Sequence, residues 1–460
     1  MSTKETGYRV ESPATGEVLE RFPTATDAEV AAAVESAHSA YRDWSALDIS
    51  ERASAVHRAA DLFESRKQEL AEIISREMGK PISEGIEEAE FSAAILRYYA
   101  DNGAQFTADQ AISTADGATA MIKRRPIGAL LGIMPWNFPY YQIARFAGPN
   151  LMLGNTIVLK HAEICPTSAQ AVDDIFRDAG VPVGGYVNVF ASHDQIATII
   201  ADPRIQGVSL TGSERAGSII ASLAGKHLKK AVLELGGSDP YVVLDTDDVT
   251  AAAQLAWSTR MYNTGQACNS NKRLIVMDDI YDDFVAELVR LAEAMEPGSP
   301  DTAGPSVYMP LSSRSAAEGL NAQVQKAVEE GATLRAGGVL GDAAFFSPAV
   351  ITDITPDMES HHVEFFGPVA VVYRVSSDDE ALAVANDSPF GLGGAVFSRD
   401  QLRAEKIARE LEVGMANVNT PAGEGAELPF GGVKRSGYGR ELGPLGMDEF
   451  VNKQLYYVQK

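Results

Sequence analysis

The chain is poor in cysteine and has no long apolar run. Only two cysteines occur among its 460 residues, which excludes a disulfide framework and a cysteine-based zinc cluster. No stretch approaches the roughly 18 uninterrupted apolar residues of a transmembrane helix, so we expect no membrane span. The start of the chain, Met1 to Tyr8, lacks the basic-then-apolar order of a signal peptide, and a cytoplasmic location is therefore expected.

Basic residues are scarce relative to acidic ones. The chain has 39 lysines and arginines against 63 aspartates and glutamates, which gives a net charge of −24. This balance argues against nucleic acid or an anionic membrane as a partner. The seven histidines show no ligand spacing beyond the pair His361-His362. Because sequence neighbours rarely bind one metal, we assign that pair to a surface or loop and predict no metal site.

The hydrophobic periodicity predicts an α/β protein with two domains. A length of 460 residues exceeds a single hydrophobic core. The N-terminal part is helical and begins with the capping box Thr26-Asp27-Ala28-Glu29. From about residue 127, short β-rich runs alternate with helical stretches, which indicates parallel sheets flanked by helices. A domain boundary is expected near residue 236.

The elements on which this prediction depends are short and regularly spaced. The expected strands are 127–134, 156–160, 186–190, 207–210, 231–235, 272–277, 369–373, 391–398 and 413–417. The expected helices in this region are 167–179, 214–224, 282–294 and 312–331. A last strand at 452–459 either completes a neighbouring subunit's sheet or closes a sheet within its own chain.

Two segments carry residues suited to covalent chemistry. Cys268 lies in the polar, turn-forming stretch Gly265-Gln266-Ala267-Cys268-Asn269-Ser270, whereas a structural cysteine prefers apolar neighbours. Glu234 ends an expected strand in Leu233-Glu234-Leu235-Gly236-Gly237. A thiol beside such a carboxylate suggests covalent catalysis at a carbonyl, although each residue alone also fits a packed thiol or a solvated strand end. The other cysteine, Cys165, is interpreted as a small packed side chain.

Three further segments suit a dinucleotide and an oxyanion, although the GxGxxG fingerprint is absent. The turn Leu210-Thr211-Gly212-Ser213 leads into a helix containing Gly217, which is a weak signal for pyrophosphate binding. Lys160 and Glu163 follow another strand, where they suit a ribose or a solvated loop. Asn137, in Met134-Pro135-Trp136-Asn137-Phe138-Pro139, belongs either to a rigid turn or to an oxyanion-binding donor.

Together these motifs resemble the aldehyde dehydrogenase superfamily. The resemblance also rests on Glu364-Phe365-Phe366-Gly367-Pro368, on Pro429-Phe430-Gly431-Gly432-Val433-Lys434 with Ser436-Gly437, and on Gly439-Arg440-Glu441, in the family's order. It implies a Rossmann-like parallel-sheet NAD(P)-binding domain at 1–112 and 129–235 and a second α/β catalytic domain at 236–446. It further implies a small β oligomerisation element at 113–128 and 447–460, and a homodimer or homotetramer.

The resemblance also implies a role for each matching residue. Cys268 would attack the aldehyde carbon, the Asn137 amide and the Cys268 backbone N–H would hold the oxyanion, and Glu234 would activate water to hydrolyse the thioester. The residues that would contact the cofactor are Trp136, Lys160, Glu163, Gly212, Ser213, Gly217, Glu364 and Phe366. Release of the acyl group to CoA or phosphate is disfavoured because Glu234 is retained, and a non-catalytic homologue is disfavoured because all three catalytic residues are present.

The cofactor preference is predicted from one carboxylate. Glu163 should accept hydrogen bonds from a free ribose 2′-OH and repel a 2′-phosphate, so NAD is expected to be preferred. Lys160 can attract that phosphate, and NADP is therefore kept as a second cofactor.

The substrate prediction rests on a resemblance, within the superfamily, to bacterial succinate-semialdehyde dehydrogenases. It is carried by residues 159–162 and 234–240. Arg145 matches an arginine by which such enzymes hold the distal carboxylate, the alternative being a salt bridge at a surface or interface. Two departures are Tyr262, where some of these enzymes carry a second arginine, and Glu424, in a loop where a serine often assists. Succinate semialdehyde is the predicted substrate, and another small aliphatic or aromatic aldehyde is the alternative.

Overall fold

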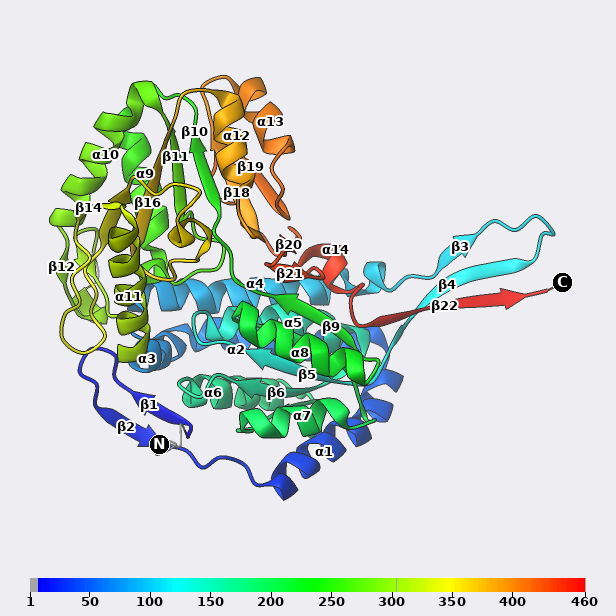
Figure 1. Ribbon diagram of the computed structural model, residues 1–460. Helices are drawn as coiled ribbons and strands as arrows, with labels where there is room; N and C mark the ends of the chain where they lie inside the picture. The colour runs from blue at the N-terminus through cyan, green and yellow to red at the C-terminus, as the bar shows by residue number, and fades with distance from the viewer. Residues whose placement is uncertain (1–6, 303, 460) are drawn as a thin grey trace.

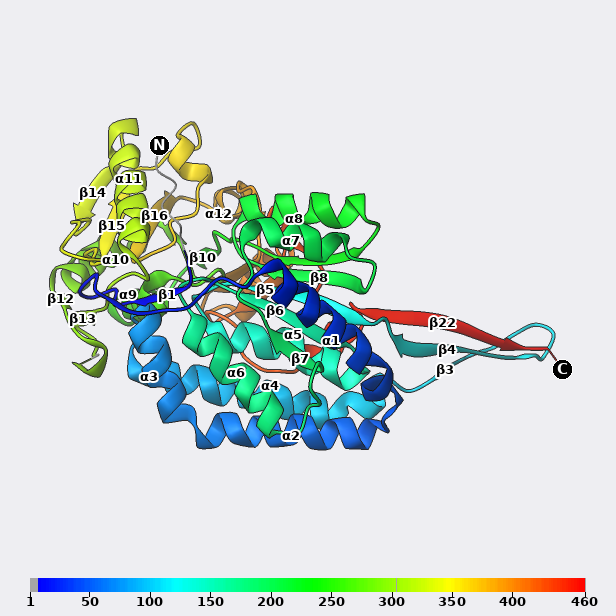
Figure 2. The ribbon, with the colours of Figure 1, turned by 90° about the horizontal axis from the view of Figure 1, so that it is seen from below.

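Two large sheets organise the computed structural model, which describes residues 7–302 and 304–459 (Figure 1). The first sheet has six strands in the order β21-β9-β8-β5-β6-β7, and the second has seven in the order β14-β15-β16-β11-β10-β18-β19. Helices lie between successive strands and cover the sheets (Figures 1 and 2). The α/β architecture predicted from the alternating pattern is confirmed.

Four helices precede the first sheet, with a short hairpin before them. The capping box at Thr26 is present, because Thr26 Oγ1 accepts from Glu29 N and the Glu29 carboxylate accepts from Thr26 N at 2.7 Å. Figure 2 shows α2 and α4 running side by side along one face of the molecule. These elements are β1 (Arg9–Glu11), β2 (Val18–Arg21), α1 (Asp27–Ala46), α2 (Ile49–Ser65), α3 (Lys67–Met78) and α4 (Ile82–Phe106).

The first sheet is parallel except at one edge. Its strand β6 is buried along its whole length and β5 at all residues but Ile133, as expected for near-continuous apolar runs that helices cover on both faces. Its strands are β5 (Ala129–Met134), β6 (Thr156–His161), β7 (Tyr186–Asn188), β8 (Ile205–Thr211), β9 (Lys230–Glu234) and the antiparallel β21 (Gly437–Tyr438). Its helices are α5 (Pro139–Leu153), α6 (Pro166–Asp178), α7 (His193–Ala201) and α8 (Glu214–Lys226).

The second sheet is also largely parallel, with the antiparallel β14 at one edge. Its strands are β10 (Pro240–Val243), β11 (Arg273–Met277), β14 (Thr333–Ala336), β15 (Ala349–Thr352), β16 (Val369–Val375), β18 (Gly393–Phe397) and β19 (Met415–Val418). Its helices are α9 (Val249–Met261), α10 (Asp278–Glu293), α11 (Arg314–Glu330), α12 (Asp378–Asn386) and α13 (Gln401–Arg409). The short pieces between them are η1 (Tyr262–Gly265), β12 (Glu296–Pro297), η2 (Pro300–Thr302), β13 (Val307–Tyr308) and η3 (Glu359–His362).

The strand predicted at 391–398 is divided in two. β17 (Phe390–Gly391) pairs antiparallel with β20 (Val433–Lys434), whereas β18 belongs to the second sheet. The reason is that Gly391 bonds to two other segments of the chain. Its N–H donates to Ser436 Oγ at 3.0 Å, and its carbonyl accepts from Gly414 N. The pairing at this point was not visible in the local pattern.

A three-stranded arm projects from the body of the molecule (Figures 1 and 2). It contains β3 (Gln110–Ile112), β4 (Thr119–Pro126) and β22 (Val451–Val458), in the order β22-β4-β3 and all antiparallel, and α14 (Gly443–Gly446) precedes its last strand. The predicted C-terminal strand is therefore confirmed, and it pairs with a strand of its own chain. β22 is an edge strand and carries exposed apolar side chains, including Leu455, which is 64% exposed.

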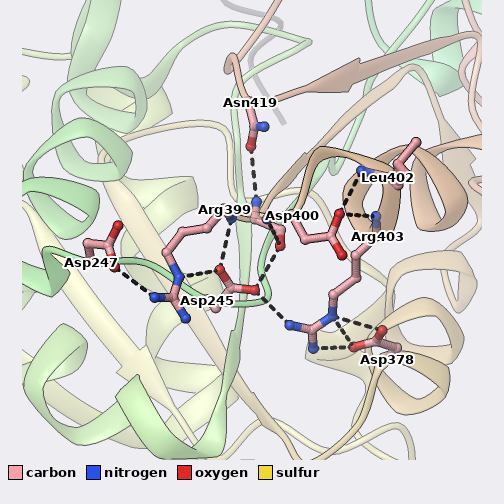
Figure 3. A network of polar contacts seen from close by, with 9 residues as sticks. Asp245, Asp247, Asp378, Arg399, Asp400, Leu402, Arg403 and Asn419 are labelled. Carbon is pink, nitrogen blue, oxygen red and sulfur yellow. Dashed lines mark hydrogen bonds and ion pairs between the residues drawn. The ribbon is translucent and has the colours of Figure 1, made fainter.

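A charged network closes the carboxyl ends of two neighbouring strands in the second sheet (Figure 3). Asp245 follows β10 and Arg399 follows β18, and the two side chains are 3.0 Å apart. Asp245 also accepts from Arg403 of α13 at 2.7 Å, and Arg403 is paired with Asp378 of α12. The network therefore occupies the carboxyl ends of β10 and β18.

Candidate active site

The predicted catalytic residues meet where the carboxyl edge of the first sheet faces the amino edge of the second. Asn137 follows β5 and Glu234 is the last residue of β9. Cys268 precedes β11 and Glu364 precedes β16. Hydrogen bonds join these segments. Asn137 Nδ2 donates to the Gln266 carbonyl at 3.0 Å, and Gly237 N, in the connection from β9 to β10, donates to Glu364 Oε1 at 3.1 Å.

The Asn137 carboxamide is fixed at both ends. Its Nδ2 donates to the carbonyl of Gln266, two residues before Cys268, and its Oδ1 accepts from Gln142 Nε2 at 2.9 Å. These partners determine which end of the amide is the donor. Since the amide nitrogen carries two hydrogens and Gln266 takes one, a second donor is left beside the cysteine loop.

The loop before Cys268 has an unusual backbone. Asn263, Thr264 and Gly265 have φ values of 50°, 53° and 72°, and each non-glycine residue held in this left-handed region costs about 1–3 kcal/mol. The buried Arg260 supports the loop by donating to the Gly265 carbonyl at 3.0 Å and to Ser270 Oγ at 2.9 Å. Backbone strain that the surroundings enforce in this way is typical of functional sites.

Cys268 is partly buried and lines a cavity of about 780 Å³. Burial raises the pKa of the Cys268 thiol to about 11, against the opposing effect of the nearby Arg145 and Lys272. Lys272 Nζ also donates to the Cys268 carbonyl at 2.8 Å, which fixes the backbone of the nucleophile. Aromatic residues that line the cavity are Phe91, Phe138, Tyr141, Tyr241, Tyr262 and Phe430.

Glu234 is a buried carboxyl group without fixed polar partners. Neither of its oxygens has a hydrogen-bond partner among the described residues. Burial, and then the neighbouring Glu441, raise the pKa of Glu234 well above its usual range, which favours the protonated form. Gly431 provides the room for it, because a Cβ there would lie 2.6 Å from Glu234 Oε1.

The two residues predicted to meet the nicotinamide half of the cofactor face the same region as Trp136. The Phe366 and Trp136 rings meet edge to face, with centroids 5.8 Å apart. Glu364 is held between Lys272 Nζ at 3.1 Å and the backbone N–H of Gly237. Glycine is needed beside it, because a Cβ at Gly236 would overlap the Glu364 carboxylate.

The residues predicted to meet the adenosine half lie at the carboxyl ends of β6 and β8. Lys160 Nζ and Glu163 Oε1 form an ion pair at 2.5 Å. Ser213 caps α8 by accepting from Ala216 N at 3.3 Å, which places a helix N-terminus where an anion is favoured. Gly217 has a packing role as well, because a Cβ there would lie 2.6 Å from the side chain of Leu235.

Arg145 reaches the cavity but is already paired. Its side chain is only 1% exposed and forms an ion pair with Glu441. The guanidinium lies between two aromatic rings, 4.8 Å from the Tyr141 centroid and 4.4 Å from the Phe430 centroid. Arg145 therefore lines the cavity, and its salt bridge lies in the interior of the chain rather than at a surface or interface as the alternative interpretation expected; its binding of a substrate carboxylate stays a prediction.

Several residues of the site had no clear signal in the sequence. Lys272 and Arg260 are buried cations that bond to backbone carbonyls and also to Glu364 and to Ser270 Oγ, respectively, and Glu441, which the motif Gly439-Arg440-Glu441 included without a role, is the partner of Arg145. Lys272 directly precedes the largely apolar strand β11, and a charged residue at such a place is the one signal in the sequence that could have indicated it. Gln142, one turn into α5, is recognised only by its contact with Asn137.

His361 and His362 lie in η3, and His361 is buried rather than at the surface. Together with Asp387 they place three potential metal-ligand atoms within 4.8 Å of one another. Both ring nitrogens of His361 already have protein partners, Tyr373 Oη at 3.2 Å and the Asp387 carbonyl at 3.0 Å.

Within residues 7–302 and 304–459, no helix is long and apolar enough to cross a membrane.

A thiol, a buried carboxyl and an oriented amide between two parallel-sheet domains define a class of NAD(P)-dependent oxidoreductases that work through a cysteine. The chain belongs to the aldehyde dehydrogenase family, whose model matches residues 1–455. The resemblance found in the sequence is therefore confirmed, and the protein is an NAD(P)-dependent enzyme that oxidises an aldehyde.

Relatives extend over almost the whole chain. The succinate-semialdehyde dehydrogenase [NADP(+)] of Deinococcus radiodurans is 51% identical over 454 residues, covering 98% of this chain and 94% of the relative. The enzyme of the same name from Mycobacterium avium is 40% identical and covers 97% and 96%. The crystal structure of succinic semialdehyde dehydrogenase from Streptococcus pyogenes in complex with NADP+ is similar with a TM-score of 0.95 and 41% identity, covering 98% of this chain and 100% of that chain. The expected preference for NAD gains no support from these relatives, which are named for NADP(+).

Proposed function

We propose that this enzyme oxidises succinate semialdehyde to succinate through a thiohemiacetal and a thioester on Cys268. The observation that supports this proposal is that Cys268 and Arg145 line one cavity, while Asn137 is bonded to the loop before Cys268 and Glu234 is close enough to affect the charge of the thiol. Similar proteins named succinate-semialdehyde dehydrogenase add support.

The first chemical step belongs to Cys268 and Asn137. The thiol passes its proton to water, and the sulfur of the resulting thiolate attacks the aldehyde carbon, so that a C–S bond forms and the electron pair of the carbonyl π bond moves to the oxygen as an oxyanion. The free N–H of Asn137 and the backbone N–H of Cys268 then donate to that oxyanion. Gln142 and Gln266 hold the Asn137 amide in the orientation that this requires, so little reorganisation is needed during the reaction.

The cofactor supplies a nicotinamide ring that accepts the hydride from the thiohemiacetal carbon. The residues fit such a group, because a helix N-terminus capped by Ser213 suits its pyrophosphate and glycines leave room beside Glu364. Glu364 and Phe366 would hold the nicotinamide end, and Lys160 with Glu163 the adenosine ribose.

Glu234 carries out the second half of the reaction. Burial favours the protonated form of its carboxyl, and the ionised form is the one that can take a proton from water. The activated water then attacks the thioester, and the acid leaves while the sulfur of Cys268 is released. The nearby positive charge of Arg145 favours the ionised form of Glu234 and so assists this step.

Substrate recognition is the finer part of the proposal. Arg145 is the cavity's buried cation, and its pairing with Glu441 weakens its attraction for a second carboxylate. Glu424 lies at the exposed part of the lining, where it repels an anionic substrate at the entrance. A neutral small aldehyde is the alternative that these two contacts favour.

The proposal is tested by reduced-cofactor formation with succinate semialdehyde, propanal and benzaldehyde, each with NAD and with NADP. We expect the highest kcat/KM for succinate semialdehyde. The Arg145→Leu variant should lose at least about tenfold more in kcat/KM on this substrate than on propanal, because only the carboxylate substrate loses a charge-assisted hydrogen bond, whereas the assistance to Glu234 is lost with both. Arg66→Leu, which changes a half-buried arginine paired with Glu69 outside the cavity lining, is the matched control and should alter the turnover of neither substrate. Equal losses on both aldehydes would contradict carboxylate recognition by Arg145.

The same measurement tests the cofactor preference. We propose that Glu163 favours NAD, because its carboxylate has a lowered pKa beside Lys160, despite the opposing effect of burial, and is therefore ionised at neutral pH. An ionised carboxylate at the ribose repels a 2′-phosphate. The relatives are named for NADP(+). A higher kcat/KM with NADP than with NAD would overturn this part of the proposal without affecting the chemistry at Cys268.

A further inference from the structure

Two glutamates lie one turn apart on α4 and hold the two segments that meet at the oxyanion donor. Glu88 binds the start of α5, directly after Asn137, and Glu84 binds the loop that leads to Cys268. Residues four positions apart share one face of a helix, so both carboxylates point to the same region. Neither contact was expected from the sequence.

Glu88 provides the fixed side of this arrangement. Its Oε1 accepts from the backbone nitrogens of Tyr140 at 2.8 Å and Tyr141 at 3.2 Å, in the first turn of α5. Its Oε2 accepts from Lys80 Nζ at 2.5 Å, and both side chains are at most 1% exposed. The helix N-terminus and the lysine together compensate the buried negative charge, so the start of α5 is held firmly.

Glu84 holds the strained side. Its Oε2 accepts from the backbone nitrogen of Asn263 at 2.9 Å. Asn263 and Thr264 are both in the left-handed region, which a non-glycine residue occupies only when its surroundings enforce it. The bond from Glu84 reaches the first residue of this strained turn, where it opposes relaxation of the backbone.

A continuous set of hydrogen bonds then leads from Glu84 to the catalytic amide. The Asn263 side chain donates from Nδ2 to the Asn137 carbonyl at 2.9 Å and to the Gln266 carbonyl at 3.2 Å. The Gln266 carbonyl is also the acceptor for Asn137 Nδ2. Any movement of Asn263 therefore changes both the backbone and the side-chain contacts of Asn137.

We propose that Glu84 is a positioning residue, which acts through Asn263 and Gln266 to orient the Asn137 amide toward the oxyanion. This inference rests on the proposed function, because it assumes that Asn137 is the oxyanion donor. Glu84 does not belong to the set of described residues that line the cavity, so its effect is exerted through its neighbours.

The test is a double-mutant cycle on the rate of hydride transfer in the first turnover, with saturating cofactor and aldehyde. Asn137→Ala should lower this rate about 100-fold or more, and Glu84→Ala about tenfold. If Glu84 acts through Asn137, the double variant is no slower than Asn137→Ala, because the two effects are not additive. Additive losses overturn the positioning role alone. An unchanged rate in Asn137→Ala overturns the proposed oxyanion donor, and this inference with it.

Three further variants distinguish positioning from a loss of folding. Glu84→Gln keeps an oxygen acceptor and should recover the rate to within about threefold. Asn263→Gly keeps the backbone N–H and tolerates the left-handed conformation, but lacks the side-chain donor, and should lose about tenfold. Glu90→Ala removes a partly exposed glutamate of α4 that pairs with Lys67, and should leave the rate unchanged. Full activity in Asn263→Gly overturns the proposal even if Glu84→Ala does not fold.

Discussion

Cys268 is held as a thiol, which gives the free enzyme a characteristic reactivity. Burial raises its pKa to about 11, so at pH 7 only a very small fraction is thiolate. Because thiolate is the reacting species, the rate of alkylation by iodoacetamide should rise about tenfold for each pH unit between pH 7 and pH 9. The measurement is the second-order rate of inactivation of the cofactor-free enzyme across this range.

The second cysteine provides the control for this prediction. Cys165 is buried and burial also raises its pKa well above the usual value, so it should not react in the native protein. Cys268→Ser should therefore incorporate no label under native conditions. A rate that levels off near pH 8 would show that the thiol is already activated before the cofactor binds.

The central site residues were assigned through the resemblance to a family, because the local signal of each segment alone also fitted a rigid turn, a solvated strand end or a packed thiol. Asn137 lies between two prolines, Glu234 ends a strand before two glycines, and Cys268 follows a polar turn. Arg145 and Glu441 form a pair that only the tertiary fold brings together, and no local pattern indicates it. The contact of Glu84 with Asn263 depends in the same way on the packing of α4 against the catalytic loop.

At the scale of elements, the strands with long apolar runs were predicted, whereas some of the short strands, such as β10 and β15, were missed. β5, β6 and β8 match the prediction to within a few residues. β10 begins with a proline and has four residues, and β15 also has four, so their alternation is too short to be recognised. These strands form because neighbouring strands supply their hydrogen-bond partners on both sides.

The elements of the second sheet are tied together by Asp245, which predicts a loss of stability in acid. Burial alone would raise its pKa, but hydrogen bonds from Arg399 and Ser398 and the charge of Arg403 lower it to about 2. A lowered folded-state pKa contributes stability above the unfolded value near 3.8, which is lost as pH falls from about 4 to about 2. Asp245→Asn should lower the free energy of unfolding at pH 7 by about 2 kcal/mol.

Urea denaturation at pH 7 and at pH 3 measures this effect, since the difference between wild type and Asp245→Asn should shrink at the lower pH. Asp247→Asn is the matched control, because Asp247 pairs with the same Arg399 but its side chain is 81% exposed. An exposed pair of this kind contributes about 0–1 kcal/mol. Equal destabilisation by the two variants would show that Asp245 has no special place in the network (Figure 3).

At the scale of the whole molecule, catalysis requires the two sheets to face each other with opposite edges. The first presents the carboxyl ends of its strands, where helix N-termini suit the cofactor, and the second presents the amino ends with Cys268.

We propose that the cofactor domain, the catalytic domain and the arm are separate units. The arm then begins at β3, because Gln110–Ile112 pairs with β4. The sequence placed this strand in the cofactor domain because three residues carry no recognisable periodicity.

The arm also predicts how the subunits assemble. We propose that β22 and its exposed side chains Leu455 and Tyr457 form a contact between subunits of a homodimer or homotetramer, because an uncovered apolar edge strand favours association. Leu455→Lys should shift the mass measured by light scattering toward a smaller species, since a charge is buried without a partner in such an interface. Leu402→Lys, on α13, changes a similarly exposed leucine outside the arm and should leave the mass unchanged. If the mass is unchanged in Leu455→Lys but falls in Leu402→Lys, the contact between subunits lies on the second domain instead.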